Sequence, residues 1–437
     1  MAVLVSAVIM AVHLYYTKKR KGRLLTVGSV YISIWCVCLA ISSFGLYELF
    51  VPSLKTYILA YGHCIIFSLI SLFSGRLCNN LEAFVSEFQY DESHNLAGGK
   101  LQINTFLMVV LHIITYLYSA NYFRTAWSYL SLFGVQSLRG ASLEDIGQTT
   151  SSALMFQWVL LPVFSITMIY AGIKLVRERK FSIIVVFAIL DAVLYGVLYG
   201  GRYIFFKLAF FLIMPAIIEN SKGIFGLIKR EKKIFAIVVA AFIVIVVITS
   251  DRRLSGFNFA GNVIVYYTGS IGFLDKLMDT FNPPQYYGYF TFGSVINFVR
   301  SVLNIVFSIP YAGSDQVFND YTAAGLRIGA HTIYNSLSTS IYPFVLDFGY
   351  YFSFIGTVLF ALLANFTEKQ FYRKRSASTE CLYIFVLYTV FDSILKYNFI
   401  SPGSLISLIL PFLFVTRRPI NFVFNKRSKE NAAGSTR

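Results

Sequence analysis

Long apolar runs, separated by short polar or basic segments, dominate the pattern of this chain. They predict eleven transmembrane helices, at residues 1–17, 24–46, 57–75, 101–120, 154–175, 181–199, 203–218, 234–250, 341–366, 380–396 and 403–416. Most runs have roughly 16 to 25 residues, a length that suits the crossing of a bilayer. A basic cluster follows residues 1–17 instead of preceding them, which favours a first transmembrane helix over a cleavable signal. The sequence therefore predicts an all-α polytopic membrane protein with one transmembrane domain over residues 1–437.

The longest interruption of this pattern is residues 251–340, a loop of about ninety residues, and connections of that length usually have a function. The loop is too rich in aromatic residues to be a disordered linker. Within it, residues 294–310 place Asn297, Arg300 and Asn304 on one face of a helix, which predicts an amphipathic helix lying in the membrane interface. The alternative is a short additional span, which would break the charge alternation described next.

Basic residues mark every second connection. Most of the 37 Lys and Arg residues lie in 18–23, 174–180, 229–233 and 369–375, at Arg76, Lys100 and Lys222, and in the tail from Arg417. The positive-inside rule assigns these segments to the cytoplasm, which also receives the polar loop 76–100 and the C-terminus. The loop 251–340 and the N-terminus are then expected outside.

Composition supports the membrane prediction and removes one class of partner. Of the residues, 57% are hydrophobic and only 13% charged, whereas soluble domains carry about 25% charged residues. The net charge of +16 would suggest nucleic acid for a soluble protein, but here the basic residues follow the topology, so no nucleic acid is expected. The five cysteines have no metal-ligand spacing and are expected to be inert.

The segment GLRIGAHTIYNS, residues 325–336, holds the best candidate for proton transfer. His331 is the one histidine of five that the topology places in an outer loop, and histidine accepts protons near neutral pH. A structural histidine is the alternative. On a helix, Arg327, His331 and either Tyr334 or Asn335 would share a face.

Four arginines on the outer side suggest an anion site. Arg202 follows two glycines at the start of a span, Arg252 and Arg253 follow another span, and Arg327 is the fourth. Arginine suits the bidentate binding of phosphate, and the free N–H groups at a helix start also favour an anion. Anchoring to lipid headgroups is the alternative. We expect an outer pocket for a phosphate or a diphosphate.

One acid supplements this set, and several catalytic motifs are missing. Asp347 lies inside the predicted span 341–366, where it could orient an arginine or form a structural ion pair.

The sequence has no DxD-like pair, HExxH, Walker A or GxSxG motif. Chemistry that requires a metal, a nucleotide or another cofactor is therefore not expected.

The layout and these short motifs together resemble the O-antigen and capsular repeat-unit polymerase family (Wzy type). The shared features are the many spans, the large late outer loop, the GGR turn at 200–202, the cluster from Arg327 to Asn335, and FVLDFGYYFSFIGTVLFALL from Phe344. The resemblance covers residues 100–416 as an overall layout.

The resemblance implies an inner-membrane glycosyltransferase of the GT-C-like kind that needs no metal. It would join oligosaccharide repeat units carried on undecaprenyl diphosphate, at the outer face of the bacterial inner membrane, and a chain-length regulator is a further implied partner. Arg202, Arg252, Arg253 and Arg327 would then bind the donor diphosphate, with His331 as acceptor base and with Tyr334 and Asn335 on sugar hydroxyls.

Two alternatives stay open at this point. An O-antigen ligase has the same donor and layout and differs in its acceptor. A lipid-linked oligosaccharide flippase or another transporter also needs cations for the diphosphate, but it is disfavoured by the long outer loop and by the lack of an internal repeat.

Overall fold

The described part of the chain is all-α, apart from one short hairpin. The computed structural model describes residues 1–86, 103–133, 155–178, 182–198, 203–219, 232, 236, 240, 259–280, 285–309, 313–323, 325–334, 337–374 and 376–414. Fourteen α-helices and one two-stranded antiparallel sheet occur within these residues. The predicted span 234–250 lies almost entirely outside them.

The helices are α1 (Ala2–Lys21), α2 (Val27–Ser42), α3 (Leu54–Ser86), α4 (Thr105–Phe133), α7 (Leu161–Glu178), α8 (Ile183–Leu198), α9 (Tyr203–Glu219), α12 (Phe259–Thr280), α13 (Gly293–Phe307), α14 (Ser314–Thr322), α15 (Ile341–Phe352), α16 (Phe354–Lys374), α17 (Ala377–Asp392) and α18 (Pro402–Phe414). A π-helical turn, Met155–Leu160, leads into α7, and 3₁₀ turns occur at Leu46–Glu48 and Asn398–Ile400. The strands are β1 (Leu326–Arg327) and β2 (Ile333–Tyr334).

Several helix boundaries differ from the prediction. Helix α3 continues to Ser86, so the first part of the predicted polar loop 76–100 is helical, and α4 continues to Phe133 instead of ending near residue 120. The predicted span 341–366 is two helices, because Gly349 has a left-handed backbone (φ 73°) that ends the regular helix. The amphipathic helix predicted at 294–310 is confirmed as a helix, α13.

Fewer helices reach membrane-spanning length than the sequence predicted. Two described segments, Leu54–Phe73 and Met155–Glu178, are long and apolar enough to cross a bilayer. Five further apolar helices in the described residues have 10–17 residues, namely α2, α13, α18 and parts of α4 and α8. By length and composition alone, therefore, the helices give only weak support to eleven spans.

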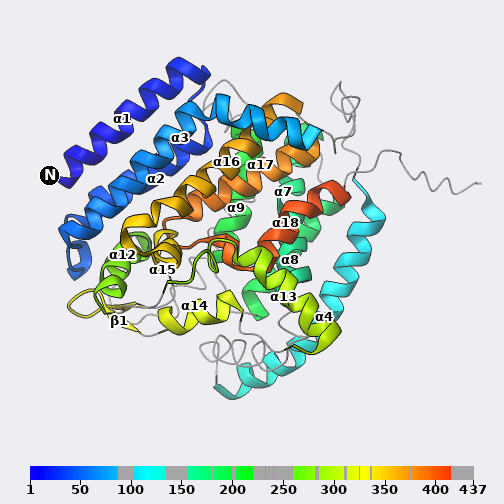
Figure 1. Ribbon diagram of the computed structural model, residues 1–437. Coiled ribbons are helices and arrows are strands. Elements are labelled where there is room, and N and C mark those ends of the chain that lie inside the picture. Colours follow the sequence, from blue (N-terminus) through cyan, green and yellow to red (C-terminus); the bar gives the residue numbers. More distant parts are fainter. Residues whose placement is uncertain are drawn as a thin grey trace, which may run out of the picture.

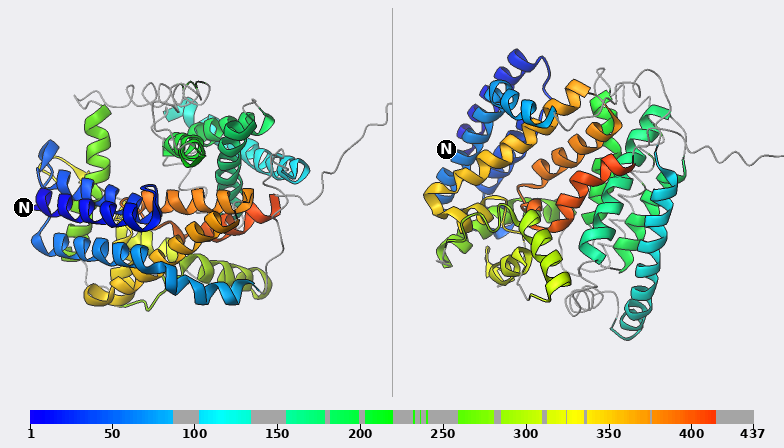
Figure 2. Two further views of the ribbon diagram at one scale, coloured as in Figure 1. Left: turned by 90° about the horizontal axis from the view of Figure 1, so that it is seen from above. Right: turned by 45° about the vertical axis from the view of Figure 1, so that its right-hand side comes forward.

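The long helices form a bundle with a second group of elements at one end. Helices α1, α2, α3, α16 and α17 run side by side, and α7, α8, α9 and α18 continue the bundle (Figure 1). Elements α12, α14 and β1 gather at the lower end of the same view, and α12 runs across the direction of the long helices (Figure 2). The residues of the predicted long loop thus cover one end of the bundle.

Contacts at the other end join segments that the charge pattern assigned to the cytoplasm. The Glu368 carboxylate is 3.3 Å from Lys21 Nζ and 3.0 Å from Arg23 Nη2. Arg177 pairs with Glu219 (3.0 Å) and with Glu380. These ion pairs bring together helix ends from five separate parts of the chain, all on the same predicted side.

Burial is reversed on two of the helices. The residues of α1 that are buried are Ser6, His13 and Thr17, while Leu4 is 71% exposed. On α13 the buried residues are likewise small or polar, Asn297 among them, while Phe307 is 65% exposed. In water, a helix normally buries its apolar face and exposes its polar one.

Helix α7 packs closely on α9 at a glycine. A Cβ at Gly172 would overlap the carbonyl oxygen of Phe211, which is backbone and cannot rotate away. We expect Gly172→Ala to force α7 and α9 apart and to cost about 1–3 kcal/mol, the usual cost of overpacking. Thermal unfolding of the purified protein in detergent measures this as a lower midpoint.

Gly272 provides the matched control, because a Cβ there would meet its nearest neighbour, Ile328 Cβ, at an ordinary 3.7 Å. Gly272→Ala is expected to unfold like the wild type. Equal midpoints for the two alanine variants would contradict the proposed close contact between α7 and α9.

Candidate functional site

The segment predicted to carry the acceptor base is a hairpin and not a helix. Leu326 pairs with Tyr334, and Arg327 pairs with Ile333, in antiparallel register. The expectation that Arg327, His331 and Tyr334 share a helical face is therefore wrong. The β-branched residues of this segment and its glycines favour extended chain and turns over helix.

The hairpin turn is fixed to the segment between α2 and α3. The Phe50 N–H donates to the carbonyl of Ile328 (2.8 Å), and the Ala330 N–H donates to the carbonyl of Glu48 (3.0 Å). A Cβ at Gly329 would lie only 2.7 Å from that Glu48 oxygen, so the close approach requires glycine. The hairpin is thus built against residues 48–50.

Arg327 is exposed, but it is partly engaged by its own turn. Its Nε donates to the carbonyl of Gly329 (3.2 Å), and its Nη2 donates to the carbonyl of Ala330. A guanidinium has five N–H donors, so three remain for an external acceptor. Arg327 can therefore shape the turn and still contact a ligand.

His331 is largely exposed. Its side chain is 86% exposed, and its Nε2 lies 3.8 Å from an oxygen of Glu48, which is itself 65% exposed. An exposed pair of this kind contributes little to stability. The imidazole is therefore accessible to a solute.

Tyr334 has a packing role in this structure. It is 8% exposed, and its hydroxyl donates to the carbonyl of Tyr266 on α12 at 2.8 Å. Its ring contacts Phe273, with centroids 5.5 Å apart, and burial raises the pKa of its hydroxyl well above the ordinary value. The hydroxyl is therefore not accessible to a sugar. The other predicted sugar ligand, Asn335, and the arginines Arg202, Arg252 and Arg253 lie outside the described residues.

Asp347 binds backbone donors. It is fully buried, and its carboxylate accepts from the N–H of Phe290 (3.0 Å) and from both the N–H and the hydroxyl of Thr291 (2.6 Å each). It lies on the short helix α15 and not within a spanning helix. Asp347 thus anchors the turn before α13, and none of its described partners is an arginine.

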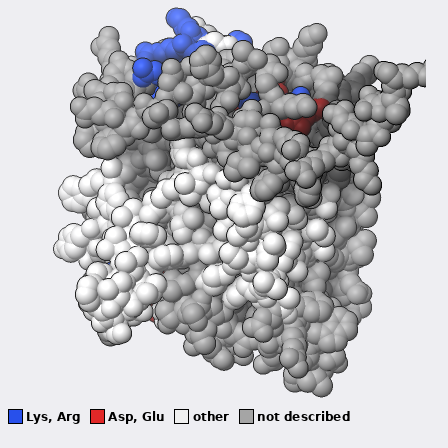
Figure 3. Space-filling view, turned by 90° about the vertical axis from the view of Figure 1, so that its right-hand side faces the viewer, with Lys and Arg blue, Asp and Glu red and all other residues white. Residues whose placement is uncertain are grey.

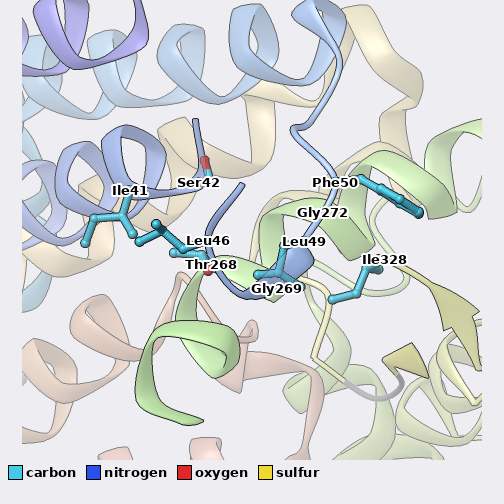
Figure 4. Close-up of a pocket in the computed structure, with 9 residues that line it drawn as sticks. All are labelled: Ile41, Ser42, Leu46, Leu49, Phe50, Thr268, Gly269, Gly272 and Ile328. Atoms are coloured by element: carbon cyan, nitrogen blue, oxygen red, sulfur yellow. The ribbon is translucent and has the colours of Figure 1, made fainter. Parts of the chain in front are cut away.

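A small apolar cavity lies beside the hairpin. Its lining comes from the end of α2, the following 3₁₀ turn, α12 and Ile328 of the hairpin, and no charged residue is among the nine residues shown (Figure 4). A site for a diphosphate or a sugar needs placed polar groups. This cavity therefore does not provide the expected site.

A polar cluster that the sequence analysis did not assign lies at the start of α9, directly after Arg202. Tyr203 donates its hydroxyl to Asp392 Oδ1, and Asn398 Nδ2 donates to Asp392 Oδ2 at 2.8 Å. Asp392 is fully buried at the end of α17. Lys396 is exposed, and its Nζ lies 6.0 Å from the Tyr203 ring centroid.

Lys207 lies one helical turn further along α9. Its Nζ donates to Ser165 Oγ at 2.7 Å and lies 5.3 Å from the ring centroid of Tyr388. Among the residues that the structure describes, no carboxylate lies within ion-pair distance of Lys207. Its position within an apolar run was the available signal, because charges in such runs usually have a function.

Helix α12 connects the two candidate regions. The carbonyl of Tyr266 holds the Tyr334 hydroxyl, and the neighbouring Tyr267 contacts Phe391 of α17, with ring centroids 6.2 Å apart. The hairpin therefore packs on α12. The cluster of Tyr203, Lys207, Asp392, Lys396 and Asn398, hereafter the α9 cluster, adjoins the same helix through Phe391, the neighbour of Asp392.

Comparison of the chain with protein-family models, with curated proteins and with solved structures finds no match in any of the three.

The packing role of Tyr334 can be separated from a role in binding. Tyr334→Phe removes only the bond to the Tyr266 carbonyl and is expected to cost about 1 kcal/mol of unfolding free energy. Tyr334→Ala also empties the space beside Phe273 and is expected to cost about 3–5 kcal/mol. Unfolding midpoints in detergent measure both. If the alanine variant were as stable as the wild type, the buried position of Tyr334 would be refuted.

Proposed function

We propose that this chain is a multi-pass membrane protein. The reversed burial of α1 and α13 supports this proposal, because exposed Leu, Val and Phe side chains are stable in contact with lipid. One face of the molecule has Lys and Arg gathered at one end, above a broad described area without charged residues (Figure 3). That arrangement suits a bilayer beside the uncharged area and the cytoplasm beside the basic end.

Within the membrane, the protein is proposed to polymerise oligosaccharide repeat units carried on undecaprenyl diphosphate, as its resemblance to repeat-unit polymerases suggests. The observation that carries the proposal is Lys207, a half-buried lysine whose ammonium has no described carboxylate within ion-pair distance. A charge that is partly removed from water and lacks a directly paired counter-charge is costly, and an anionic ligand would compensate it. Arg202 directly before Tyr203, and Lys396 beside its ring, add positive charge near the same place.

The donor diphosphate is therefore assigned to the α9 cluster. Lys207, Arg202 and Lys396 would neutralise the diphosphate and the charge that grows on it as it leaves. Asp392, which accepts from Tyr203 and Asn398, would fix the Tyr203 ring beside Lys396. Arg252 and Arg253 are proposed to contribute to the same anion from the segment before α12.

The acceptor is assigned to the hairpin. A hydroxyl oxygen of the acceptor sugar attacks the anomeric carbon of the donor, and the bond from that carbon to the diphosphate oxygen breaks. The bonding electrons leave with the undecaprenyl diphosphate, and the proton of the hydroxyl passes to His331. Arg327 would hold the acceptor with its remaining donors. No step of this scheme requires a metal.

The proposal is tested with purified protein in liposomes that contain the lipid-linked repeat unit, with chain length read on a gel. Wild type is expected to make a ladder of polymer. His331→Ala and Arg202→Ala are expected to leave single repeat units on the lipid, and Lys207→Met is expected to slow polymerisation about 100-fold, as the loss of one charge-stabilising donor does.

Lys55→Met is the matched control for Lys207→Met, because Lys55 is an exposed lysine on the same predicted side, with its Nζ 5.3 Å from the Tyr350 ring centroid. It is expected to polymerise at the wild-type rate. Full-length polymer from His331→Ala and Arg202→Ala at normal protein levels would refute the assignment.

A further inference from the structure

A tyrosine in an unfavourable backbone conformation projects from the turn just before α13. Tyr287 is 81% exposed and has φ 50°, and the next residue, Gly288, has φ 94°. The Tyr289 N–H donates to the Tyr286 carbonyl at 3.1 Å, so residues 286–289 form a tight turn whose two central residues have positive φ. Asn or Asp followed by Gly is favoured in such turns, and a bulky residue with positive φ is strained.

The strained turn is held by buried groups beneath it. The N–H groups of Tyr286 and Tyr287 donate to the carbonyls of Leu346 (3.0 Å) and Asp347 (2.9 Å). The Asp347 carboxylate binds the turn's far end at Phe290 and Thr291. A conformation that the surroundings maintain against strain frequently marks a functional site. The turn itself does not require tyrosine at position 287. The presence of a strained tyrosine there indicates that its side chain has a functional role.

Further tyrosines surround this turn. The hydroxyls of Tyr286 and Tyr321 are 2.8 Å apart, and the rings of Tyr286 and Tyr289 lie at 26° to each other with centroids 6.2 Å apart. The hydrogen bond to Tyr321 raises the pKa of Tyr286 to about 12, so its hydroxyl remains protonated at neutral pH. Tyr287 therefore offers an exposed ring face, and the half-buried Tyr286, Tyr289 and Tyr321 surround it with neutral hydroxyl groups.

The neighbouring helix indicates an aqueous ligand rather than lipid. Tyr321 belongs to α14, whose exposed residues are Gln316, Asn319, Asp320 and, at its end, Ala323. By contrast, α13 exposes Val, Leu, Ile and Phe. The turn leads into α13 at Phe292, but Tyr286 is joined to the polar helix α14 through the Tyr321 hydroxyl, so the tyrosines lie between an apolar and a polar surface. A tyrosine of an interfacial aromatic belt would be expected beside apolar side chains alone.

We propose that Tyr286, Tyr287, Tyr289 and Tyr321, hereafter the tyrosine surface, bind a pyranose ring of the glycan, with Tyr287 stacking on the face of the ring. Aromatic rings provide a large, stiff contact area with a polar hydroxyl at the edge, which suits a sugar. The identity of the glycan as a polymer repeat unit rests on the proposed function. The sugar contacts that the sequence analysis expected at Tyr334 are thereby assigned to the tyrosine surface instead.

The test uses full-length protein in lipid nanodiscs and the water-soluble glycan released from the lipid-linked repeat unit by mild acid. Calorimetry measures its affinity for wild type, Tyr287→Asn and Tyr287→Trp. Asn suits positive φ, so Tyr287→Asn keeps the turn and removes the ring. We expect Tyr287→Asn to weaken glycan binding about tenfold, without a lower unfolding midpoint, and Tyr287→Trp to bind at least as well as the wild type.

Tyr15→Ala serves as the control, since Tyr15 is 62% exposed on α1, in the half of that helix near the basic end, and it should leave glycan affinity unchanged. Equal affinity of Tyr287→Asn and wild type would overturn the proposal. A purely structural role would instead appear as a lower midpoint for Tyr287→Asn with unchanged affinity.

The Tyr287→Trp variant also distinguishes a glycan from the bilayer as the partner of this position. The indole that it introduces adds fluorescence to that of the wild type, and this added fluorescence is expected to change when the glycan binds. If brominated lipids quench the added fluorescence and the glycan does not affect it, position 287 contacts the bilayer and the proposal is overturned.

This measurement is independent of polymer synthesis. Loss of glycan affinity in Tyr287→Asn would support the tyrosine surface even if the wild type formed no polymer, and the polymerase function would then fail alone. Polymer synthesis that depends on Lys207 and His331, together with unchanged glycan affinity in Tyr287→Asn, would refute only the tyrosine surface.

Discussion

Hydrogen bonds between polar faces of helices hold this bundle together where apolar side chains point outward. The Ser6 hydroxyl is 2.8 Å from that of Tyr61, and His13 Nδ1 is 2.6 Å from Ser68 Oγ, so α1 docks on α3 through its polar residues. In lipid, exposing leucine carries no penalty, and each such bond contributes about 1 kcal/mol. A few polar contacts and close approaches at glycine therefore determine which helices become neighbours.

Polar contacts also position α13 and the hairpin. Helix α13 docks through Asn297, whose side chain donates to the carbonyl of Ile400 (3.0 Å) and accepts from the N–H of Ser314 (2.8 Å). Its apolar face is left for the proposed bilayer. Helix α12, in turn, carries the hairpin through Tyr266 and contacts α17 through Tyr267. The proposed donor and acceptor regions thus depend on one helix for their relative position.

The sequence predicted where most helices lie along the chain better than it predicted which segments contact one another. Periodicity located most helices and the amphipathic α13, because apolar runs and one-sided polarity are local properties. It failed at 325–334 and at 341–366, where Gly329 is required by a contact with distant Glu48 and Gly349 ends a helix in a conformation that hydropathy does not encode. The residues next to Gly329 and Gly349 in the sequence indicate neither the contact with Glu48 nor the positive φ of Gly349.

The site was predicted in part for the same reason. The exposure of His331 and Arg327 agrees with their prediction in a loop, while their roles in a site stay a prediction. The burial of Tyr334 and the backbone contacts of Asp347 depend on α12 and on residues 286–291, which the sequence does not place beside them. Lys207 carried a sequence signal of its own, a charge within an apolar run, but the lack of a described carboxylate within ion-pair distance is visible only in three dimensions.

The pairing of residues 48–50 with the hairpin has a consequence for how the protein is made. The first outer loop leaves the ribosome early, and its backbone partners at Ile328 and Ala330 are synthesised only after most of the helices. Contacts so distant in sequence form late. The surface that carries His331 therefore takes shape only on a bundle whose earlier helices are already in place, so a chain with a misplaced helix would not present the hairpin assembled on residues 48–50.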